Sequence, residues 1–284
     1  MKEFDFLKII KKQTQSTYIG DDCAYLKELG IVVTQDNFVE DIHFKRNWAT
    51  PYQIGYKAAA VNISDILASG AEPAYISIGL SIPNNVDDYF IKELYRGFIS
   101  GAYGAEIIGG DITGAEKIMI SITAIGKSLG RKISSRGNAK PGYVVITNRE
   151  HGKSLKGFEE LKSGKLISEN ISAHLEPKLE PEFSKSISTQ INHDYAMMDT
   201  SDGLADALFQ IAKASNCTII AKEIEGIYAT EDYNLVAAVP YEFLNKLNNY
   251  IIVGEVTEYD GSYLKIGSNS YNKHEELNLY DHFN

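Results

Sequence analysis

The sequence predicts an α/β or α+β protein with two domains. At 284 residues the chain is longer than a typical single small domain. Its composition, 44% hydrophobic and 23% charged residues, is that of an ordinary globular protein with a packed core. Segments with strand-like and helix-like patterns alternate along the chain, and this alternation favours mixed layers of sheet and helix.

The first half of the chain contains the elements expected of an N-terminal domain. Residues 1–15 have the pattern of a short amphipathic helix. Residues 55–70, "GYKAAAVNISDILASG", predict an Ala-rich helix that ends with Gly70 in the position typical of a C-terminal cap. Apolar residues at helical spacing predict a second helix within 86–105. Strands are expected at 30–36, 74–83, 106–111 and 117–127.

A change of composition near residue 136 marks the expected domain boundary. Gly137, Pro141 and Gly142 indicate a turn before an apolar strand at 143–147. We therefore expect an N-terminal domain over residues 1–136 and a C-terminal α/β domain over residues 137–284.

The C-terminal half gives a weaker pattern at first and a clearer one later. Residues 149–196 are polar, with a short helix expected at 156–165 and a connector at 176–183. A helix is expected at 201–215, with Ser201 as its N-cap and Asp202 in its first turn, where the helix dipole favours negative charge. Beyond it, residues 233–240, 241–249 and 250–256 have the patterns of a strand, a helix and a strand.

Charge and cysteine content exclude several classes of function. Asp and Glu total 38 against 28 Lys and Arg, which argues against broad binding to nucleic acid or to an anionic membrane. The two cysteines, Cys23 and Cys217, do not have the spacing of a zinc site or of a disulfide framework. The N-terminus does not have the pattern of a signal peptide, and the apolar runs are far shorter than the roughly 20 residues of a membrane span. We expect a soluble cytoplasmic protein.

Aspartates recur beside Gly, Ser, Thr or Asn at the ends of the expected elements. One such aspartate alone is usually a cap or turn residue, but the recurrence indicates oxygen ligands for a hard cation such as Mg²⁺, with a nucleotide as its companion. The chain contains no Walker motif and no protein-kinase signature, so any phosphate site has another architecture. The aspartates are Asp21, Asp22, Asp36, Asp65, Asp111, Asp199 and Asp202.

Eight motifs follow one another along the chain: "IGDDCAYL", "TQDNFVEDIHF", "GYKAAAVNISDILASGAEP", "EIIGGDIT", "SSRGNAKPGYVVIT", "MDTSDGLADAL", "ATEDYNLVAAVP" and "YDHF". With these motifs, the chain resembles the thiamine-monophosphate kinase family from about residue 16 to its last residue. The resemblance implies the two-domain fold of aminoimidazole ribonucleotide synthetase and a homodimer whose N-terminal sheets pair. It also implies transfer of the γ-phosphoryl group of ATP to thiamine monophosphate, giving thiamine diphosphate and ADP, with several Mg²⁺ ions.

The resemblance also implies roles for individual residues. Tyr103, Gly110, Asp111, Arg136 and Ser201 fall on ATP-contacting positions. His43, Glu231 and Tyr280 fall on positions that contact the thiamine substrate, whose cationic thiazolium suits a carboxylate and an aromatic ring. The metal-binding positions are Asp22, Thr34, Gln35, Asp36, Asp65, Asp111, Asp199 and Asp202.

No residue is expected to act as a general base. A phosphate monoester has a second pKa of about 6, so the attacking oxygen is already mostly anionic near neutral pH. Catalysis would then consist of alignment and charge stabilisation by the metal cluster of Asp36, Asp65, Asp111 and Asp202.

The chain departs from the family pattern at three places. Gln35 stands where the family has threonine, which is tolerable if the backbone carbonyl supplies the oxygen. Ala229 and Thr230 replace glycines before "EDY", and the second domain is shorter than usual. Two alternatives therefore stay open: phosphoryl transfer to another small acceptor, and a non-catalytic nucleotide-binding module.

Overall fold

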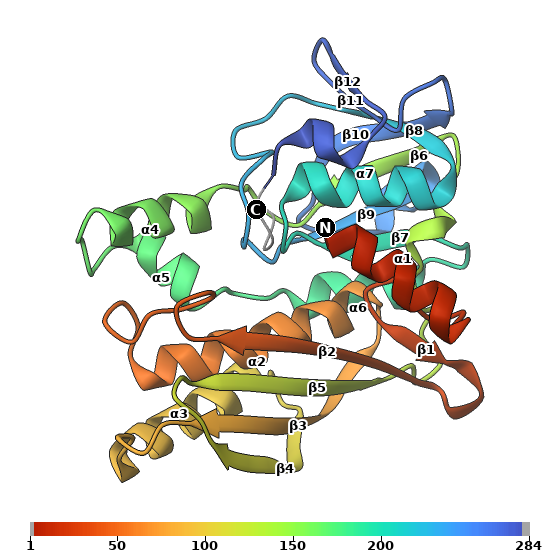
Figure 1. Ribbon diagram of the computed structural model, residues 1–284. Coiled ribbons are helices and arrows are strands. Elements are labelled where there is room, and N and C mark those ends of the chain that lie inside the picture. Colours follow the sequence, from red (N-terminus) through yellow and green to blue (C-terminus); the bar gives the residue numbers. More distant parts are fainter. Residues whose placement is uncertain (1–2, 280–284) are drawn as a thin grey trace.

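The computed structural model describes residues 3–279 and contains two β-sheets with helices packed around them (Figure 1). The first sheet takes its strands from residues 24–127 and the second from residues 143–271. This mixed architecture confirms the predicted fold class. The domain boundary near residue 136 falls between the two sheets and stays a prediction.

The first sheet has five strands in the order β1, β2, β5, β3, β4. Antiparallel pairing joins β2 to β5 and β5 to β3, whereas β4 runs parallel to β3 at the edge of the sheet. The predicted strands of this region are confirmed. The strands are β1 (Ala24–Leu26), β2 (Ile31–Val39), β3 (Glu72–Ile82), β4 (Glu106–Gly114) and β5 (Met119–Lys127).

Helix α2 (Pro51–Ala68) lies between the two sheets and is buried over most of its surface. It begins at a capping box in which Thr50 and Gln53 satisfy each other's backbone N–H groups. Its end agrees with the predicted cap, because Gly70 has φ +85° and donates its N–H to the Leu67 carbonyl. Helix α3 (Asp88–Gly101) crosses α2 so closely that a Cβ on Gly97 would lie 2.0 Å from a backbone oxygen of Tyr52.

The second sheet has seven strands in the order β12, β11, β8, β10, β6, β9, β7. Strand β6, inside this sheet, is buried on both faces, so alternate side chains enter two different cores. Val144 and Ile146 join the core shared with the first sheet, and Val145 joins the core on the other side. The strands are β6 (Tyr143–Thr147), β7 (Ala196–Asp199), β8 (Cys217–Ala221), β9 (Leu235–Pro240), β10 (Ile251–Glu258), β11 (Leu264–Ile266) and β12 (Asn269–Tyr271).

The remaining helices cover the second sheet or extend from it. Helix α7 (Leu204–Ser215) packs on one face, and α6 (Pro181–Gln190) lies with α2 on the other. Helices α4 (Lys153–Lys162) and α5 (Glu169–Leu175) pack together in a lobe at the left of Figure 1. Helix α1 (Glu3–Thr14) lies in front of the body. Short 3₁₀ turns occur at η1 (Lys27–Leu29), η2 (Arg136–Asn138), η3 (Tyr241–Lys246) and η4 (His274–Leu277).

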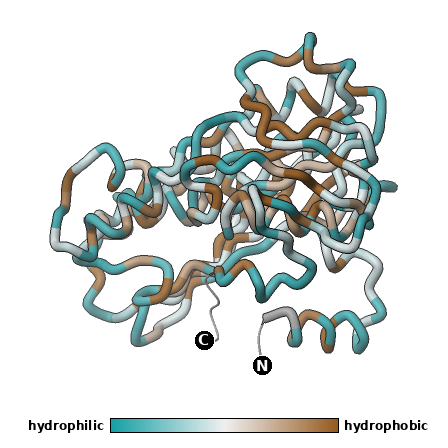
Figure 2. Tube along the Cα trace, turned by 90° about the horizontal axis from the view of Figure 1, so that it is seen from above, coloured by the Kyte–Doolittle hydropathy of each residue, from teal (hydrophilic) through white to brown (hydrophobic). Residues whose placement is uncertain are grey.

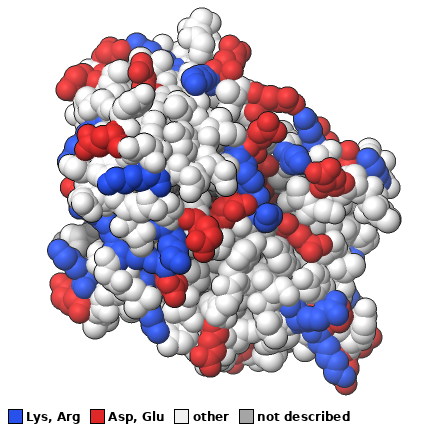
Figure 3. Space-filling view, turned by 180° about the vertical axis from the view of Figure 1, so that it is seen from behind, with Lys and Arg blue, Asp and Glu red and all other residues white. Residues whose placement is uncertain are grey.

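Hydropathy and charge follow this layering. The hydrophobic stretches run through the interior of the trace, whereas the outer loops are mostly hydrophilic (Figure 2). On the rear face, acidic and basic side chains are interspersed (Figure 3). Within residues 3–279, none of the helices combines the length and the apolar character needed to cross a bilayer.

Three sequence predictions about the C-terminal half need correction. The helix expected from residue 201 begins at Leu204, with Gly203 as its N-cap, because residues 200–203 form a turn closed by Thr200 and Gly203. Ser201 is therefore not a helix cap. The helix expected at 241–249 is only the 3₁₀ turn η3, and the weakly patterned region 149–196 contains three helices where one was expected.

Candidate active site

One face of α2 supplies several side chains to a single site. Lys57, Val61 and Asp65 follow one another at intervals of four residues, and Ser64 comes three residues after Val61, so they lie along the same side of the helix. Val61 and Asp65 line a cavity of about 950 Å³. The Ser64 hydroxyl donates a 2.6 Å hydrogen bond to Asp199 Oδ2 at the end of β7. This helix therefore links the two sheets through polar contacts at the site.

Strand β2 faces α2 with alternate residues. The Thr34 hydroxyl donates to Asp65 Oδ2 at 2.6 Å, and the Asp36 backbone N–H donates to Asn62 Oδ1 at 3.0 Å. Gln35 points to the opposite face, where its amide bonds the hydroxyls of Ser121 and Thr123 on β5. The period of two in a strand explains why Thr34 and Asp36 reach the site and the Gln35 side chain does not.

Three carboxylates from distant segments meet in a cluster in which Asp199 is buried and Asp22 and Asp65 are half-buried. Asp22, Asp65 and Asp199 each place an oxygen within 4.8 Å of the others. Arg136 Nη2 donates to Asp22 Oδ1 at 2.6 Å, and the Arg136 backbone N–H donates to Asp21 Oδ1 at 3.2 Å. The Arg136 guanidinium pairs with only one carboxylate side of the cluster. Most of the negative charge of the cluster therefore lacks a compensating cation within the described part of the chain.

Burial and mutual repulsion make ionisation of these carboxylates costly. Burial, with a smaller contribution from the charge on Asp22, raises the pKa of Asp36 to about 6 and that of Asp199 to about 7. Burial and the charge on Asp36 raise the pKa of Asp65 well above its usual value. Burial also raises the pKa of Asp22, although Arg136 opposes the change. Such a set of oxygens fits a hard divalent cation, which would supply the missing positive charge.

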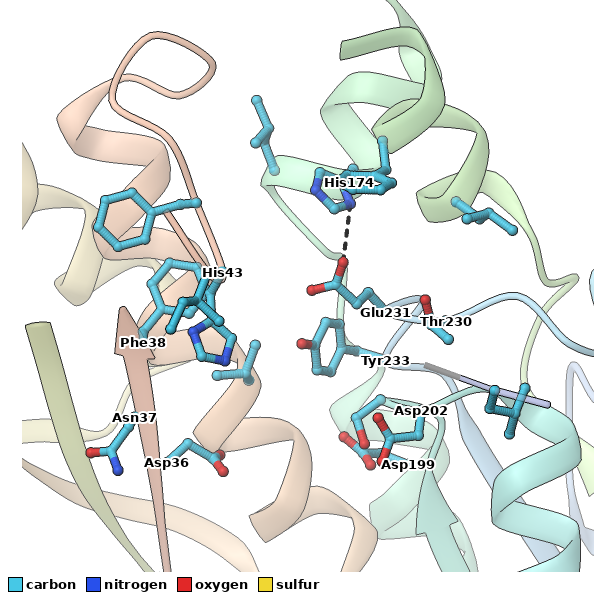
Figure 4. A pocket seen from close by; sticks show the side chains of 18 of the residues that line it. Asp36, Asn37, Phe38, His43, His174, Asp199, Asp202, Thr230, Glu231 and Tyr233 are labelled. Carbon is cyan, nitrogen blue, oxygen red and sulfur yellow. Dashed lines mark ion pairs between the residues drawn. The ribbon is translucent and has the colours of Figure 1, made fainter. Parts of the chain in front are cut away.

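The cavity has an acidic end and an apolar end. Asp36 approaches it from β2, and Asp199 and Asp202 from the opposite wall (Figure 4). Ser201 also lines the acidic end, because the turn before α7 directs residues 201 and 202 into the cavity. The other end is lined by Phe38, Phe44, Trp48, Leu155, Phe158 and Leu175. With a divalent cation held at the acidic end, this arrangement suits a ligand with an anionic group at that end and a flat apolar group at the other.

Glu231 lies on the wall between these ends. Its Oε1 pairs with Lys57 Nζ at 3.2 Å, and its Oε2 lies 3.6 Å from His174 Nδ1, the contact drawn in Figure 4. Glu231 has φ +60°, and its N–H donates to the Ser201 carbonyl at 2.7 Å. His43 lies across the cavity, with its Nδ1 accepting the Val39 N–H at 3.0 Å.

Several residues expected at the ATP site lie outside the cavity in the folded structure. The Tyr103 hydroxyl is 3.0 Å from that of Tyr56 and accepts the Leu179 N–H at 2.8 Å. Gly110 and Asp111 lie on the edge strand β4, outside the cavity. At Gly110 a Cβ would lie 1.8 Å from a backbone oxygen of β3, which accounts for glycine at this position. Tyr280 lies outside the described residues.

The structure also identifies site residues that the sequence interpretation missed. Lys57, His174 and Tyr233 surround Glu231 or line the cavity beside it. A lysine inside an otherwise apolar, Ala-rich helix was the available signal for Lys57, since such a charge needs a partner. His174 carried no comparable signal, because it stands in a segment of weak periodicity, whereas Tyr233 begins the strand expected at 233–240 and was given no role in the site.

Comparison with known proteins identifies relatives of this chain. Residues 20–128 match the family model described as AIR synthase related protein, N-terminal domain. Thiamine-monophosphate kinase of Bacillus subtilis is 34% identical over 235 residues, covering 77% of this chain and 72% of that protein. The enzyme of the same name from Pyrococcus horikoshii is 28% identical over 93% of this chain and 91% of that protein. A solved structure of AaThiL complexed with AMPPCP and TMP superimposes with a TM-score of 0.88 at 27% identity, covering 99% of this chain and 97% of that one.

Proposed function

The chain belongs to the thiamine-monophosphate kinase family, and we propose that it transfers the γ-phosphoryl group of ATP to thiamine monophosphate. A phosphate oxygen of thiamine monophosphate attacks the γ-phosphorus, and the bond from that phosphorus to the β–γ bridging oxygen breaks. The products are thiamine diphosphate and ADP. The observation that carries this proposal is a cavity with buried carboxylates at one end and aromatic side chains at the other.

The acidic end is the proposed site of the phosphates and of Mg²⁺. Mg²⁺ would neutralise phosphoryl oxygens and hold the two anionic reactants together. Thr34 and Ser64 fix the carboxylates of Asp65 and Asp199 by short hydrogen bonds. Arg136 fixes Asp22. These residues set the ligand positions before substrate arrives, which favours alignment over reorganisation.

Apart from Asp111, which lies on β4 outside the cavity, the remaining expected metal ligands fall into two groups. Asp36 and Asp202 reach the cavity, and we keep both as ligands. Thr34 already donates its hydroxyl to Asp65, and the Gln35 side chain faces away, so a backbone carbonyl is the oxygen that Gln35 has available. Ser201 lies beside Asp202 and remains a candidate contact of the ATP phosphates.

The other end of the cavity is the proposed site of the thiamine moiety. The flat rings of thiamine suit the apolar wall that includes Trp48 and Phe158. His43 and Glu231 approach this region from opposite sides and provide polar contacts. No side chain is assigned as a base, because the acceptor phosphate is already anionic near neutral pH.

A homodimer is part of the proposal. Tyr103, Gly110 and Asp111 lie away from the cavity of their own chain, and no strand among residues 3–279 pairs with the outer edge of β4. Exposed apolar side chains on β4 and β5, Ile108, Ile112 and Met119, support pairing of the first sheets of two copies. Cytoplasmic location is also proposed, since Cys23 and Cys217 are free thiols.

An acceptor panel tests the proposed reaction. The purified protein is incubated with ATP and Mg²⁺ and with thiamine monophosphate, thiamine or aminoimidazole ribonucleotide precursors, and ADP and phosphorylated products are separated by chromatography. We expect equal amounts of ADP and thiamine diphosphate from thiamine monophosphate, and no product from the other acceptors. Product from another acceptor alone, or ATP binding without any product, contradicts the proposal.

A further inference from the structure

Lys57 is a buried cation whose contacts join three separate parts of the chain. Its side chain is 2% exposed, within the Ala-rich helix α2. Its Nζ lies 3.2 Å from Glu231 Oε1, in the segment between β8 and β9, and 3.5 Å from His174 Nε2 on α5. An ammonium group is rarely left in such a position unless its charge is paired. The lysine is too deeply buried to contact a ligand in the cavity, so it can act there only through its partners.

The geometry of His174 shows how the Glu231 carboxylate is oriented. Lys57 Nζ can only donate, so His174 Nε2 accepts and the ring carries its proton on Nδ1. This Nδ1–H faces the Ser154 hydroxyl at 2.9 Å and Glu231 Oε2 at 3.6 Å. Burial, followed by the charge on Lys57, lowers the pKa of His174 to about 3, so the ring is neutral. Glu231 therefore has one cationic and one neutral neighbour.

Lys57 also makes the largest favourable contribution to the ionised state of the Glu231 carboxylate. Burial alone would raise the pKa of Glu231, but the charge and hydrogen bond of Lys57, with the contributions of His174 and His43, together outweigh burial and hold the pKa below its usual value. Glu231 is 31% exposed and still lines the cavity. It therefore presents a fixed, ionised acceptor to a ligand, held in a backbone conformation with φ +60° that a non-glycine residue rarely adopts.

Helix α2 sets the distance between this carboxylate and the acid cluster. Lys57 and Asp65 are eight residues apart on one face, which corresponds to about 12 Å along the helix axis. The helix is buried and stiffly packed against α3 and both sheets. A change at residue 57 would therefore move Glu231 without moving Asp65.

We propose that Lys57 is a positioning residue that, together with His174, holds the Glu231 carboxylate at a fixed distance from the acid cluster, so that the thiamine moiety is bound with its phosphate at the cluster. This inference rests on the proposed function, because it assigns Glu231 to the thiamine end of the substrate. It predicts that Lys57 governs binding of thiamine monophosphate and leaves the binding of ATP unchanged.

A double-mutant cycle tests this coupling. The variants are Lys57→Met, Glu231→Gln and the double variant, assayed for KM and kcat with thiamine monophosphate and for KM with ATP. We expect Lys57→Met to raise KM for thiamine monophosphate about tenfold or more, as for a buried pair that loses one partner, while KM for ATP changes less than about twofold. In the Glu231→Gln background, Lys57→Met should change KM for thiamine monophosphate less than about twofold.

The matched control is Lys153→Met, which removes a lysine from an exposed ion pair with Glu169 in the lobe of α4 and α5 that also carries His174. It should leave kcat and the KM values for thiamine monophosphate and ATP unchanged. Equal effects of Lys57→Met in both backgrounds, or an equal rise in KM for ATP, would overturn the proposal, because either result indicates a general structural role.

If Lys57→Met fails to fold, the double variant still decides the question, because it leaves no buried charge without a partner. The proposal then requires the double variant and Glu231→Gln to have equal KM values for thiamine monophosphate, and a further rise in the double variant overturns it. The wild-type acceptor panel is scored separately. Absence of thiamine diphosphate there refutes the proposed function, whereas normal wild-type activity with additive variants refutes only the role of Lys57.

Discussion

Replacing Asp36 by Asn should stabilise the magnesium-free protein while weakening its metal site. Asp36 sits in β2, where its backbone pairs with Ile122 and its N–H donates to Asn62, and an asparagine keeps both contacts. The substitution removes one negative charge from a buried group of carboxylates. Gain of stability with loss of function is typical of residues whose strain serves a binding site.

The size of the effect follows from the pKa of Asp36. Burial and the charge on Asp22 raise this pKa from 3.8 to about 6, so the folded state holds the proton more tightly than the unfolded chain does. The metal-free protein therefore loses stability as the pH rises from about 4 through about 6. At pH 8 the loss amounts to about 3 kcal/mol, and at pH 5 to about half of that. For a chain of this length, 3 kcal/mol corresponds to about 5 °C in Tm.

Thermal unfolding in EDTA measures this difference. Asp36→Asn should raise Tm by up to about 5 °C at pH 8, and by clearly less at pH 5. Glu106→Gln on the exposed edge strand β4 is the control, because it changes the net charge equally at a site outside the cluster. An unchanged or lower Tm at pH 8, or the same rise at both pH values, refutes the assignment of electrostatic strain to Asp36.

Three further predictions concern the metal site and the packing beneath it. Ser64→Ala removes a short hydrogen bond to Asp199, so calorimetric titration should show a Kd for Mg²⁺ about tenfold higher or more. An unchanged Kd counts against the proposal that Ser64 holds the Asp199 carboxylate in place for the metal. Mg²⁺ should raise Tm more at pH 8 than at pH 6. The reason is that Asp36 and Asp199, with pKa values of about 6 and 7, must lose protons to bind the ion. An equal rise in Tm at both pH values contradicts the assignment of the cluster as a metal site. Gly97→Ala should lower the free energy of unfolding by about 2 kcal/mol or more, since the new Cβ would lie 2.0 Å from a backbone oxygen of α2. Gly114→Ala is the control, because residue 114 has open space around it, and it should change the free energy of unfolding little.

The regular elements of the first sheet were predictable because local pattern and tertiary environment agree there. The Ala-rich stretch forms α2 and ends as Gly70 indicates. Its start was missed because Thr50 and Gln53, which form the capping box, stand before the apolar pattern begins. Residues 149–196 gave little signal because their helices are short and expose much of their surface.

The aspartates of the site were predictable as a set, but their partners were not. Recurrence beside small polar residues identified Asp22, Asp36, Asp65 and Asp199, which the fold brings close together or onto one cavity. The Lys57 contacts depend on residues more than 100 positions away, and no local pattern encodes such a distance. Asp111 illustrates the reverse case, because its motif resembles the family pattern while β4 carries it away from the cavity of its own chain.

The most direct test of the central claim is formation of thiamine diphosphate from ATP and thiamine monophosphate, measured as a function of Mg²⁺ concentration for the wild type and for Asp65→Asn. Asp65 is one of the three carboxylates of the cluster and accepts a hydrogen bond from the Thr34 hydroxyl. We expect magnesium-dependent product from the wild type and a loss of at least about 100-fold in the variant, as for removal of a principal electrostatic group. Wild-type activity that does not depend on Mg²⁺, or an Asp65→Asn variant that retains full activity, would contradict the assignment of the cluster as the catalytic metal site.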